Sequence, residues 1–258
     1  MLPLRSSLKI PQVKANASGH DFSEASVKTV GFEGVYVTSP TDTAATINAK
    51  LSAGLHVVLS PAVYQLDAPL ELNKAGQVLL GLGMATLASA KQNAVIKVGN
   101  VDGVRICSLI AQAGPPSASG QAAPVLIEFG DGTHAGSAKA PSFMHDVFAR
   151  VGGPNGDPNA PVAADTMVKV GSGFVIGDNM WFWRADHVVK DLEPPTQKSD
   201  RCANGLVVTA DDVIMYGLAV EHTEQDLVQW SGERGRTYFY QSEVSPNQCL
   251  ADSAGFQL

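Results

Sequence analysis

From Leu55 onward the chain is a succession of short apolar runs, and this feature restricts its possible folds more than any other. Each run is about four to seven residues long, and the runs are separated by glycine, proline, asparagine or aspartate, as strands bounded by turns are. No strong helical stretch lies between the runs. The sequence therefore predicts an all-β protein after Leu55.

The runs favour parallel over antiparallel pairing. Two-residue Asn-Gly or Asp-Gly turns, which close antiparallel hairpins, are scarce. The runs are nearly continuous in valine, isoleucine and leucine, as the strands of a coiled parallel sheet tend to be. We therefore expect a parallel β-helix with one coil per roughly 20 to 35 residues. An antiparallel sandwich is the alternative architecture.

One segment before these runs has the signals of a helix, PTDTAATINAKLSAG at residues 40–54. Thr41 or Asp42 can cap its start, apolar residues recur at helical spacing, and Gly54 follows as a stop. The sequence thus predicts an N-terminal capping helix near residues 42–53. We divide the chain into an N-terminal extension at 1–30, a β-helix domain at 31–247 and a tail at 248–258.

Charge and composition exclude some functions. The net charge of −7 argues against nucleic acid as a partner, and no apolar run reaches the ~18 residues of a membrane span. The first residues are too poor in apolar side chains for a signal peptide. No cysteine or histidine spacing indicates a metal site, and no glycine motif indicates a nucleotide, so no cofactor is expected. Cys202 and Cys249 can pair or remain separate.

The opening of the β region resembles a known family. DTAATINAKLSAG leads into LHVVL, PAVY and GLG, and this order is similar to the start of the pectin-lyase-like right-handed β-helix superfamily, with Ala62 in place of the usual turn glycine. The remainder resembles large secreted microbial β-helix proteins related to family 55 glucanases. The resemblance covers nearly all of residues 22–247. It implies a single-stranded right-handed parallel β-helix and an extracellular, carbohydrate-active protein. Such proteins are longer, so we expect this chain to be part of one.

The stretch WFWRADH, Trp181 to His187, combines aromatic and ionisable side chains. In a strand Trp181 and Trp183 point to one side and Phe182 to the other, so the tryptophans are expected to form an exterior ledge. Sugar rings have apolar faces that stack on indole, and their hydroxyls need polar partners. These partners can be Arg184, Asp186 and His187. The alternative is that one tryptophan packs beneath a long loop.

A second stretch repeats features of the first. GFVIGDNMWFWRADH begins at Gly173 and GLVVTADDVIMYGLAVEH begins at Gly205, and both end on an acid followed by histidine. If these are successive coils, Asp186 and Glu221 lie close together, because stacked strands are about 4.8 Å apart.

A glycosidase needs two carboxyl groups beside the scissile bond. We predict Glu221 as the acid, with Asp186 or Glu243 as its partner. The alternative is that Asp186 and Glu221 form structural ion pairs with Arg184, Arg236 or His222. Further candidates for saccharide contacts are His222, Trp230, Arg236, Tyr238 and Tyr240.

Three functions are compatible with these features. The first is a glycoside hydrolase that acts on a neutral, glucan-like polysaccharide. The second is a carbohydrate-binding or structural β-helix without catalysis. The third is a polysaccharide lyase, which the acidic pI of about 5.3 disfavours because uronate polymers need a basic surface. Each has a polysaccharide or oligosaccharide as its partner, and the oligomeric state stays open.

Overall fold

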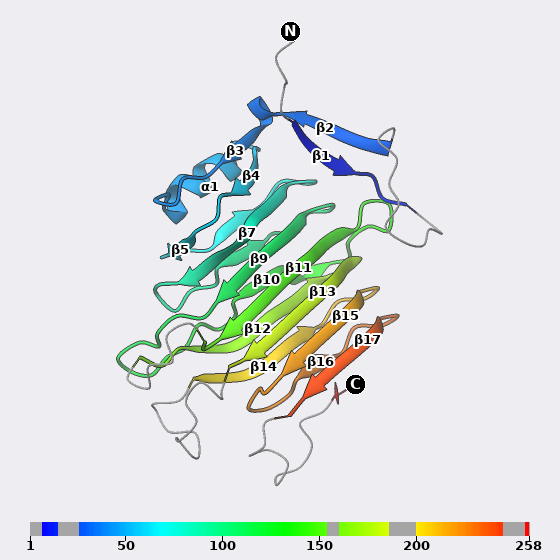
Figure 1. Ribbon diagram of the computed structural model, residues 1–258. Coiled ribbons are helices and arrows are strands. Elements are labelled where there is room, and N and C mark those ends of the chain that lie inside the picture. The colour runs from blue at the N-terminus through cyan, green and yellow to red at the C-terminus, as the bar shows by residue number, and fades with distance from the viewer. Residues whose placement is uncertain (1–6, 15–25, 154–159, 186–199, 245–255, 258) are drawn as a thin grey trace.

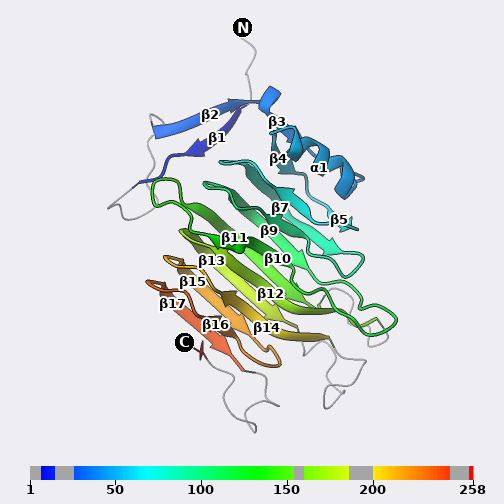
Figure 2. The same ribbon diagram turned by 180° about the vertical axis from the view of Figure 1, so that it is seen from behind.

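The protein is a parallel β-helix, as the sequence predicts. A computed structural model describes residues 7–14, 26–153, 160–185, 200–244 and 256–257. Coils stack in chain order from the N-terminal to the C-terminal end of the molecule (Figure 1), and the view from behind has the same order (Figure 2). All strand pairs between coils are parallel within the described residues, so the antiparallel sandwich does not apply.

Two sheets form the walls of the coil stack. The described part of the first sheet has nine strands, which are β3 (Val35–Val37), β4 (His56–Leu59), β5 (Val63–Leu66), β7 (Val78–Ser89), β9 (Arg105–Gln112), β11 (Ser142–Val151), β13 (Val175–Arg184), β15 (Ile214–Glu221) and β17 (Arg236–Glu243). The described part of the second has seven, which are β6 (Leu70–Leu72), β8 (Ile96–Val98), β10 (Ile127–His134), β12 (Ala163–Ser172), β14 (Arg201–Val208), β16 (Val228–Trp230) and β18 (Phe256–Gln257).

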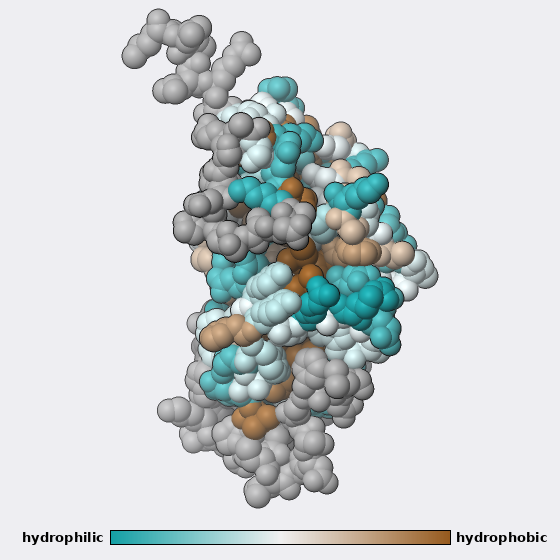
Figure 3. Space-filling model, turned by 90° about the vertical axis from the view of Figure 1, so that its right-hand side faces the viewer, coloured by the Kyte–Doolittle hydropathy of each residue, from teal (hydrophilic) through white to brown (hydrophobic). Residues whose placement is uncertain are grey.

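The interior of the coil stack is apolar because one valine, leucine, isoleucine or phenylalanine after another points inwards from both sheets. Phe129 and Phe182 are fully buried there, together with most of the aliphatic side chains of the strands. Seen from the side, hydrophobic residues show as a broken stripe along the stack between hydrophilic residues (Figure 3). The stack of coils buries this interior in the way that repeat folds do, each coil contacting its neighbours.

The predicted helix caps the N-terminal end of the stack. Helix α1 spans Ala44–Ser52, close to the predicted range, and Gly54 follows it with a φ of 87°. The expected cap was wrong, because Thr43 Oγ1 accepts the hydrogen bond from Thr46 N. Asp42 instead accepts hydrogen bonds from Ser39 N and from the Tyr36 hydroxyl. No helix among the described residues is long and apolar enough to cross a membrane.

Short elements lie before the first coil. Strands β1 (Ser7–Pro11) and β2 (Val27–Gly31) form an antiparallel pair, and a 3-10 helix, η2 (Phe32–Gly34), leads into β3. This pair lies beyond the capped end of the stack (Figure 1). The predicted division into extension, β-helix domain and tail stays a prediction.

The long strands of the nine-stranded sheet bend near their middle. In the five long strands from β9 to β17, one residue at the bend has a positive φ. These residues lie one above another because the pairs beside them are in register. We call them the bend column, and they are Ser108, Asp146, Asn179, Gly217 and Phe239. The bend divides the outer surface of this sheet into two flanks.

Candidate functional site

Trp181 and Trp183 lie on the outer surface of β13, after the bend, and Phe182 between them points into the core. Phe182 is fully buried, whereas Trp181 is 40% exposed. The two indoles stack with ring centroids 5.2 Å apart and an interplanar angle of 20°. Phe148 of β11 meets Trp181 edge to face, with centroids 6.4 Å apart. Strand alternation therefore builds the exterior aromatic ledge that the sequence predicts.

Strand register extends this ledge into a larger surface. Trp183 pairs with Arg150 on one side and with Glu221 on the other, and Glu221 pairs with Glu243. Trp181 pairs with Phe148 in the same way. We call the resulting surface the tryptophan face, and its residues are Phe148, Arg150, Trp181, Trp183, Glu221 and Glu243. It combines aromatic rings with a cation and two carboxyl groups.

The internal repeat identified the correct neighbouring strands but the wrong register. Strand β13 does pair with β15, yet Glu221 lies in register with Trp183, whereas the repeat would align it with Asp186. Gly205 lies in β14 of the other sheet, so it is not the counterpart of Gly173. Asp186 and His187 lie outside the described residues.

Among the described residues, the two carboxyl groups of the tryptophan face belong to Glu221 and Glu243. Their backbones lie on adjacent strands in register, which places them about 4.8 Å apart. His222 Nε2 lies 3.4 Å from Glu243 Oε2, and the His222 backbone N donates to the Glu243 carbonyl over 2.8 Å. The structure thus brings together three of the predicted residues, Glu221, His222 and Glu243.

Arg184 is buried, so the sequence-based expectation that it contacts substrate at the surface is corrected. Its Nε donates to the Asp200 carbonyl and its Nη1 donates to the His222 carbonyl, over 2.9 and 3.0 Å. Its Nη2 lies 3.6 Å from Glu224 Oε1, with only 9% of the arginine side chain exposed. Arg184 therefore fixes the backbone next to the tryptophan face.

Burial changes the acidity of the carboxyl groups around Arg184. Desolvation raises the pKa of Glu224 above its ordinary value, and the positive charges of Arg184 and Arg201 oppose this rise. Desolvation likewise raises the pKa of Asp200, against a hydrogen bond from Val162 N and the charge of Arg184. Such groups hold a proton more readily than exposed carboxyls do.

Sequence reasoning missed Gln112, which is buried beside this surface. Gln112 of β9 accepts a hydrogen bond from Arg150 Nε over 2.6 Å, and its Nε2 donates to the Gly152 carbonyl. Burial lowers the pKa of the Arg150 guanidinium from its ordinary value. The alternation in HDVFARV places Phe148 and Arg150 on one side, but only the register shows that this side continues into Trp181 and Trp183.

The remaining predicted residues lie away from the carboxylate pair. Arg236 and Tyr238 are exposed on the first half of β17, before the bend, and Tyr238 stacks on Tyr216. Trp230 is 7% exposed and belongs to the core. It borders a surface hollow of about 390 Å³ at the β16–β17 turn. Tyr240 packs against the core, and burial raises its pKa.

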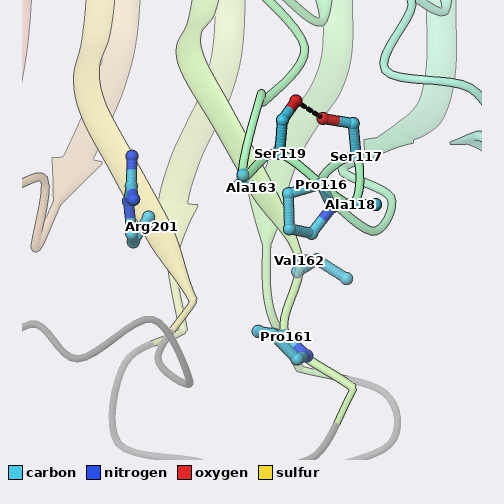
Figure 4. Close-up of a pocket in the computed structure, with 9 residues that line it drawn as sticks. Pro116, Ser117, Ala118, Ser119, Pro161, Val162, Ala163 and Arg201 are labelled. Atoms are coloured by element: carbon cyan, nitrogen blue, oxygen red, sulfur yellow. Dashed lines mark hydrogen bonds between the residues drawn. The ribbon is translucent and has the colours of Figure 1, made fainter.

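A further hollow of about 340 Å³ lies at the edge where β12 and β14 begin. Loop residues 116–120 line one side, where Ser117 Oγ and Ser119 Oγ are 2.8 Å apart, and Pro161 to Ala163 line another. Arg201 of β14 lines the hollow on the remaining side (Figure 4). Among the described residues that line it, the hollow offers a guanidinium and hydroxyl groups.

Fold and outer surface together define a pectin-lyase-like parallel β-helix with an aromatic, carboxylate-bearing face. The family model described as the LAM55 pectate lyase-like domain matches residues 35–243, and the chain belongs to this family. The similarity covers nearly all of the β-helix and confirms the resemblance that the sequence motifs indicate.

Relatives of known name and structure agree with this family. The chain is 38% identical over 237 residues to an exo-beta-1,3-glucanase of Streptomyces sp. SirexAA-E, covering 91% of this chain and 37% of that protein. It is similar to sacteLam55A of the same organism, with a TM-score of 0.83 and 35% identity over 97% of this chain and 46% of the other. A variant of sacteLam55A in complex with glucose gives a TM-score of 0.84 at 35% identity, over 96% and 45% of the two chains. The chain thus spans less than half the length of these relatives.

Proposed function

We propose that the protein acts on a β-1,3-linked glucan as a glycoside hydrolase and that the saccharide lies on the tryptophan face. The observation that supports this most is the position of the stacked Trp181–Trp183 pair directly beside Glu221 and Glu243 in the strand register. The name of the matching Streptomyces protein, an exo-beta-1,3-glucanase, supports the substrate class.

The chemistry of a neutral glucan suits these side chains. A pyranose ring presents apolar C–H groups, which pack against indole, while its hydroxyls form hydrogen bonds with carboxylates and a guanidinium. Hydrolysis needs two carboxyl groups roughly 5 to 9.5 Å apart. Glutamate side chains from strands about 4.8 Å apart reach such separations when they diverge from the sheet. Glu221 and Glu243 are therefore the proposed catalytic residues.

Glucan binding without hydrolysis is the second candidate, and a specific observation favours it. The matched region is 37% of the length of the Streptomyces glucanase, so hydrolysis by that protein can depend on residues outside the matched region. In this case the tryptophan face of the present chain binds the polymer, and Glu221 and Glu243 hold its hydroxyl groups.

An assay with β-1,3-linked oligosaccharides separates the two candidates. We expect release of reducing sugar by the unmodified protein and a loss of about 100-fold or more in Glu221→Gln or Glu243→Gln, since positioned acids and bases contribute at least this much. Glu128→Gln is the matched control, because Glu128 lies on the other sheet in an ion pair with Lys97. Binding with no turnover by the unmodified protein selects the second candidate, and full activity in both variants rejects the assigned carboxylates.

A further inference from the structure

Phe239 is the bulkiest residue of the bend column, in which Ser108 is the other residue type that seldom adopts positive φ. Asp146, Asn179 and Gly217 are residue types that adopt positive φ readily, whereas a bulky aromatic residue there is an outlier. Phe239 has a φ of 60°, and the residue is 86% exposed. The backbone conformation of Phe239 is strained, and its ring gains no stability from burial. Backbone strain of this kind tends to be retained where a residue serves function.

Two tyrosines accompany Phe239 on the flank of the sheet before the bend. Tyr216 of β15 and Tyr238 of β17 are in register, and their rings stack with centroids 5.0 Å apart and an interplanar angle of 9°. They are 41% and 49% exposed. Together with Phe239 they form an exposed aromatic group on two adjacent coils, and exposed apolar groups of this kind mark binding surfaces.

Polar side chains continue the same line of residues onto the preceding coils. Asp178 pairs with Tyr216, and His145 pairs with Asp178, in the strand register. His145 Nδ1 lies 3.1 Å from Asp178 Oδ2, and both side chains are about half exposed. Asn179 Nδ2 donates to Asp146 Oδ1 beside them. Over four coils, a polar half therefore adjoins an aromatic half.

A gap lies between these two halves at Gly217. A Cβ atom built there would have only the backbone of Asn179 within 4 Å, at 3.8 and 3.9 Å, so the space above Gly217 is open. Asn179 precedes this position in the bend column and Phe239 follows it. The bend thus has a notch with an amide on one side and an aromatic ring on the other.

We propose that Tyr216, Tyr238 and Phe239, with Asp178, Asn179 and the notch at Gly217, form a second binding site for a neutral saccharide. Aromatic rings meet the apolar face of a sugar, and the carboxylate and amide groups take up its hydroxyls. The carboxylates of Asp146 and Asp178 disfavour an anionic ligand at the same place. This site lies across the bend from the tryptophan face. Its assignment to a glucan rests on the proposed function.

Three variants test the site through different properties. Phe239→Asn replaces the outlier with a residue that tolerates positive φ, Tyr238→Ala removes half of the stacked pair, and Gly217→Asn fills the notch without backbone conflict. Phe32→Ser is the matched control, because Phe32 is also an exposed aromatic side chain, 45% exposed, at the other end of the molecule. Trp183→Ala removes part of the tryptophan face.

The probes are a β-1,3-linked hexasaccharide, an insoluble β-1,3-glucan and polygalacturonate, with dissociation constants measured for each variant. We expect Phe239→Asn and Tyr238→Ala each to weaken glucan binding about fivefold or more, as loss of one aromatic contact does. Gly217→Asn should weaken binding to a similar extent by filling the notch, and the Phe32 control should leave it unchanged. Phe239→Asn should also raise the denaturant midpoint, because it removes the backbone strain. A structural role for Phe239 would instead lower that midpoint.

The outcomes separate this site from the tryptophan face. If Trp183→Ala weakens binding while the three variants bind within twofold of the unmodified protein, the second site is wrong and the proposed function stands. If the three variants weaken binding and Trp183→Ala does not, the second site stands alone. Absence of binding to both glucans overturns both proposals. A change from dimer to monomer in the three variants, with unchanged glucan binding, also overturns the second site, since the aromatic group would then contact a second copy.

Discussion

The two sheets of this β-helix present very different outer surfaces. On the seven-stranded sheet, register places Glu71, Lys97, Glu128 and Lys169 in one line across four coils, with charges of alternating sign. Lys97 Nζ lies 3.1 Å from Glu128 Oε2. On the nine-stranded sheet the corresponding outward lines hold tryptophan, tyrosine, histidine and carboxylates.

We interpret the difference as a separation between a surface that serves stability and a surface that serves the proposed binding. Alternating charges on neighbouring strands satisfy one another and remain hydrated, so that surface offers little to a neutral ligand. Exposed aromatic rings gain from contact with a ligand, because they are otherwise in water. We therefore expect substitutions on the first surface to change stability slightly and substitutions on the second to change binding.

The largest expected effect tests the alternation of inward and outward side chains along β13, which builds the outer surface of the nine-stranded sheet. Phe182→Ala removes a fully buried ring and should lower the free energy of unfolding by about 3–5 kcal/mol. Trp181→Ala removes a ring that is 40% exposed and should cost about 1 kcal/mol. Chemical denaturation measures both. Equal losses would contradict the assignment of inner and outer sides in β13.

The buried arginine beneath the tryptophan face is the next test. Arg184→Met removes two hydrogen bonds to carbonyls and the positive charge beside Glu224, and should cost about 3 kcal/mol. Since Arg184 lowers the pKa of Glu224, the variant should raise that pKa further. Arg236→Met, an exposed arginine on β17, is the control and should have little effect.

The loss in Arg184→Met should depend on pH. Because the pKa of Glu224 is raised in the folded protein, the folded protein still holds this proton at a pH where the unfolded chain has released it. The free energy of unfolding therefore falls as pH rises from the ordinary glutamate pKa through the raised value. Denaturant midpoints measured between pH 4 and pH 8 should therefore decline more steeply in the variant than in the unmodified protein. A parallel pair of curves would contradict the role of Glu224.

Binding distinguishes the two surfaces directly. Trp183→Ala should weaken the affinity for a β-1,3-linked oligosaccharide about tenfold, which corresponds to about 1.4 kcal/mol. Lys169→Ala, on the charged line of the other sheet, should leave the affinity unchanged. Calorimetric titration measures both dissociation constants. Because the ligand is neutral, both constants should be insensitive to salt, and a strong salt dependence would argue for a different ligand.

The smallest expected effect concerns the charged line itself. Lys97→Glu places three acidic residues on consecutive coils, Glu71, position 97 and Glu128, and should cost about 1 kcal/mol at low salt. The loss should shrink in high salt, where exposed charges are screened. Lys97→Gln is the control for the lost attraction alone. A loss that is independent of salt would show that Lys97 contributes by packing rather than by charge.

Much of the fold follows from the sequence because its signals are local. The apolar runs, the scarcity of hairpin turns and the helix before Gly54 indicate a capped parallel β-helix, and alternation places Phe182 inside. The same alternation turns Arg184 inwards beside Phe182, and this signal could have corrected its assignment as a surface residue.

Register is the part that the sequence leaves open. Loops of different length separate the strands, so Val168 pairs with Leu206, and Leu206 pairs with Val228, at unequal spacings along the chain. The repeat that ends in two acid–histidine pairs therefore suggested the wrong neighbour for Glu221. Glu243, Arg150 and Gln112 join the same outer line only through backbone pairing between coils, which no single strand encodes.

A crystal structure with a bound β-1,3-linked oligosaccharide tests the central claim most directly. We predict sugar rings against Trp181 and Trp183 on the outer surface of the nine-stranded sheet, with hydroxyls toward Glu221 and Glu243. An oligosaccharide bound along the line of Glu71, Lys97, Glu128 and Lys169, with the tryptophan pair uncovered, would contradict it.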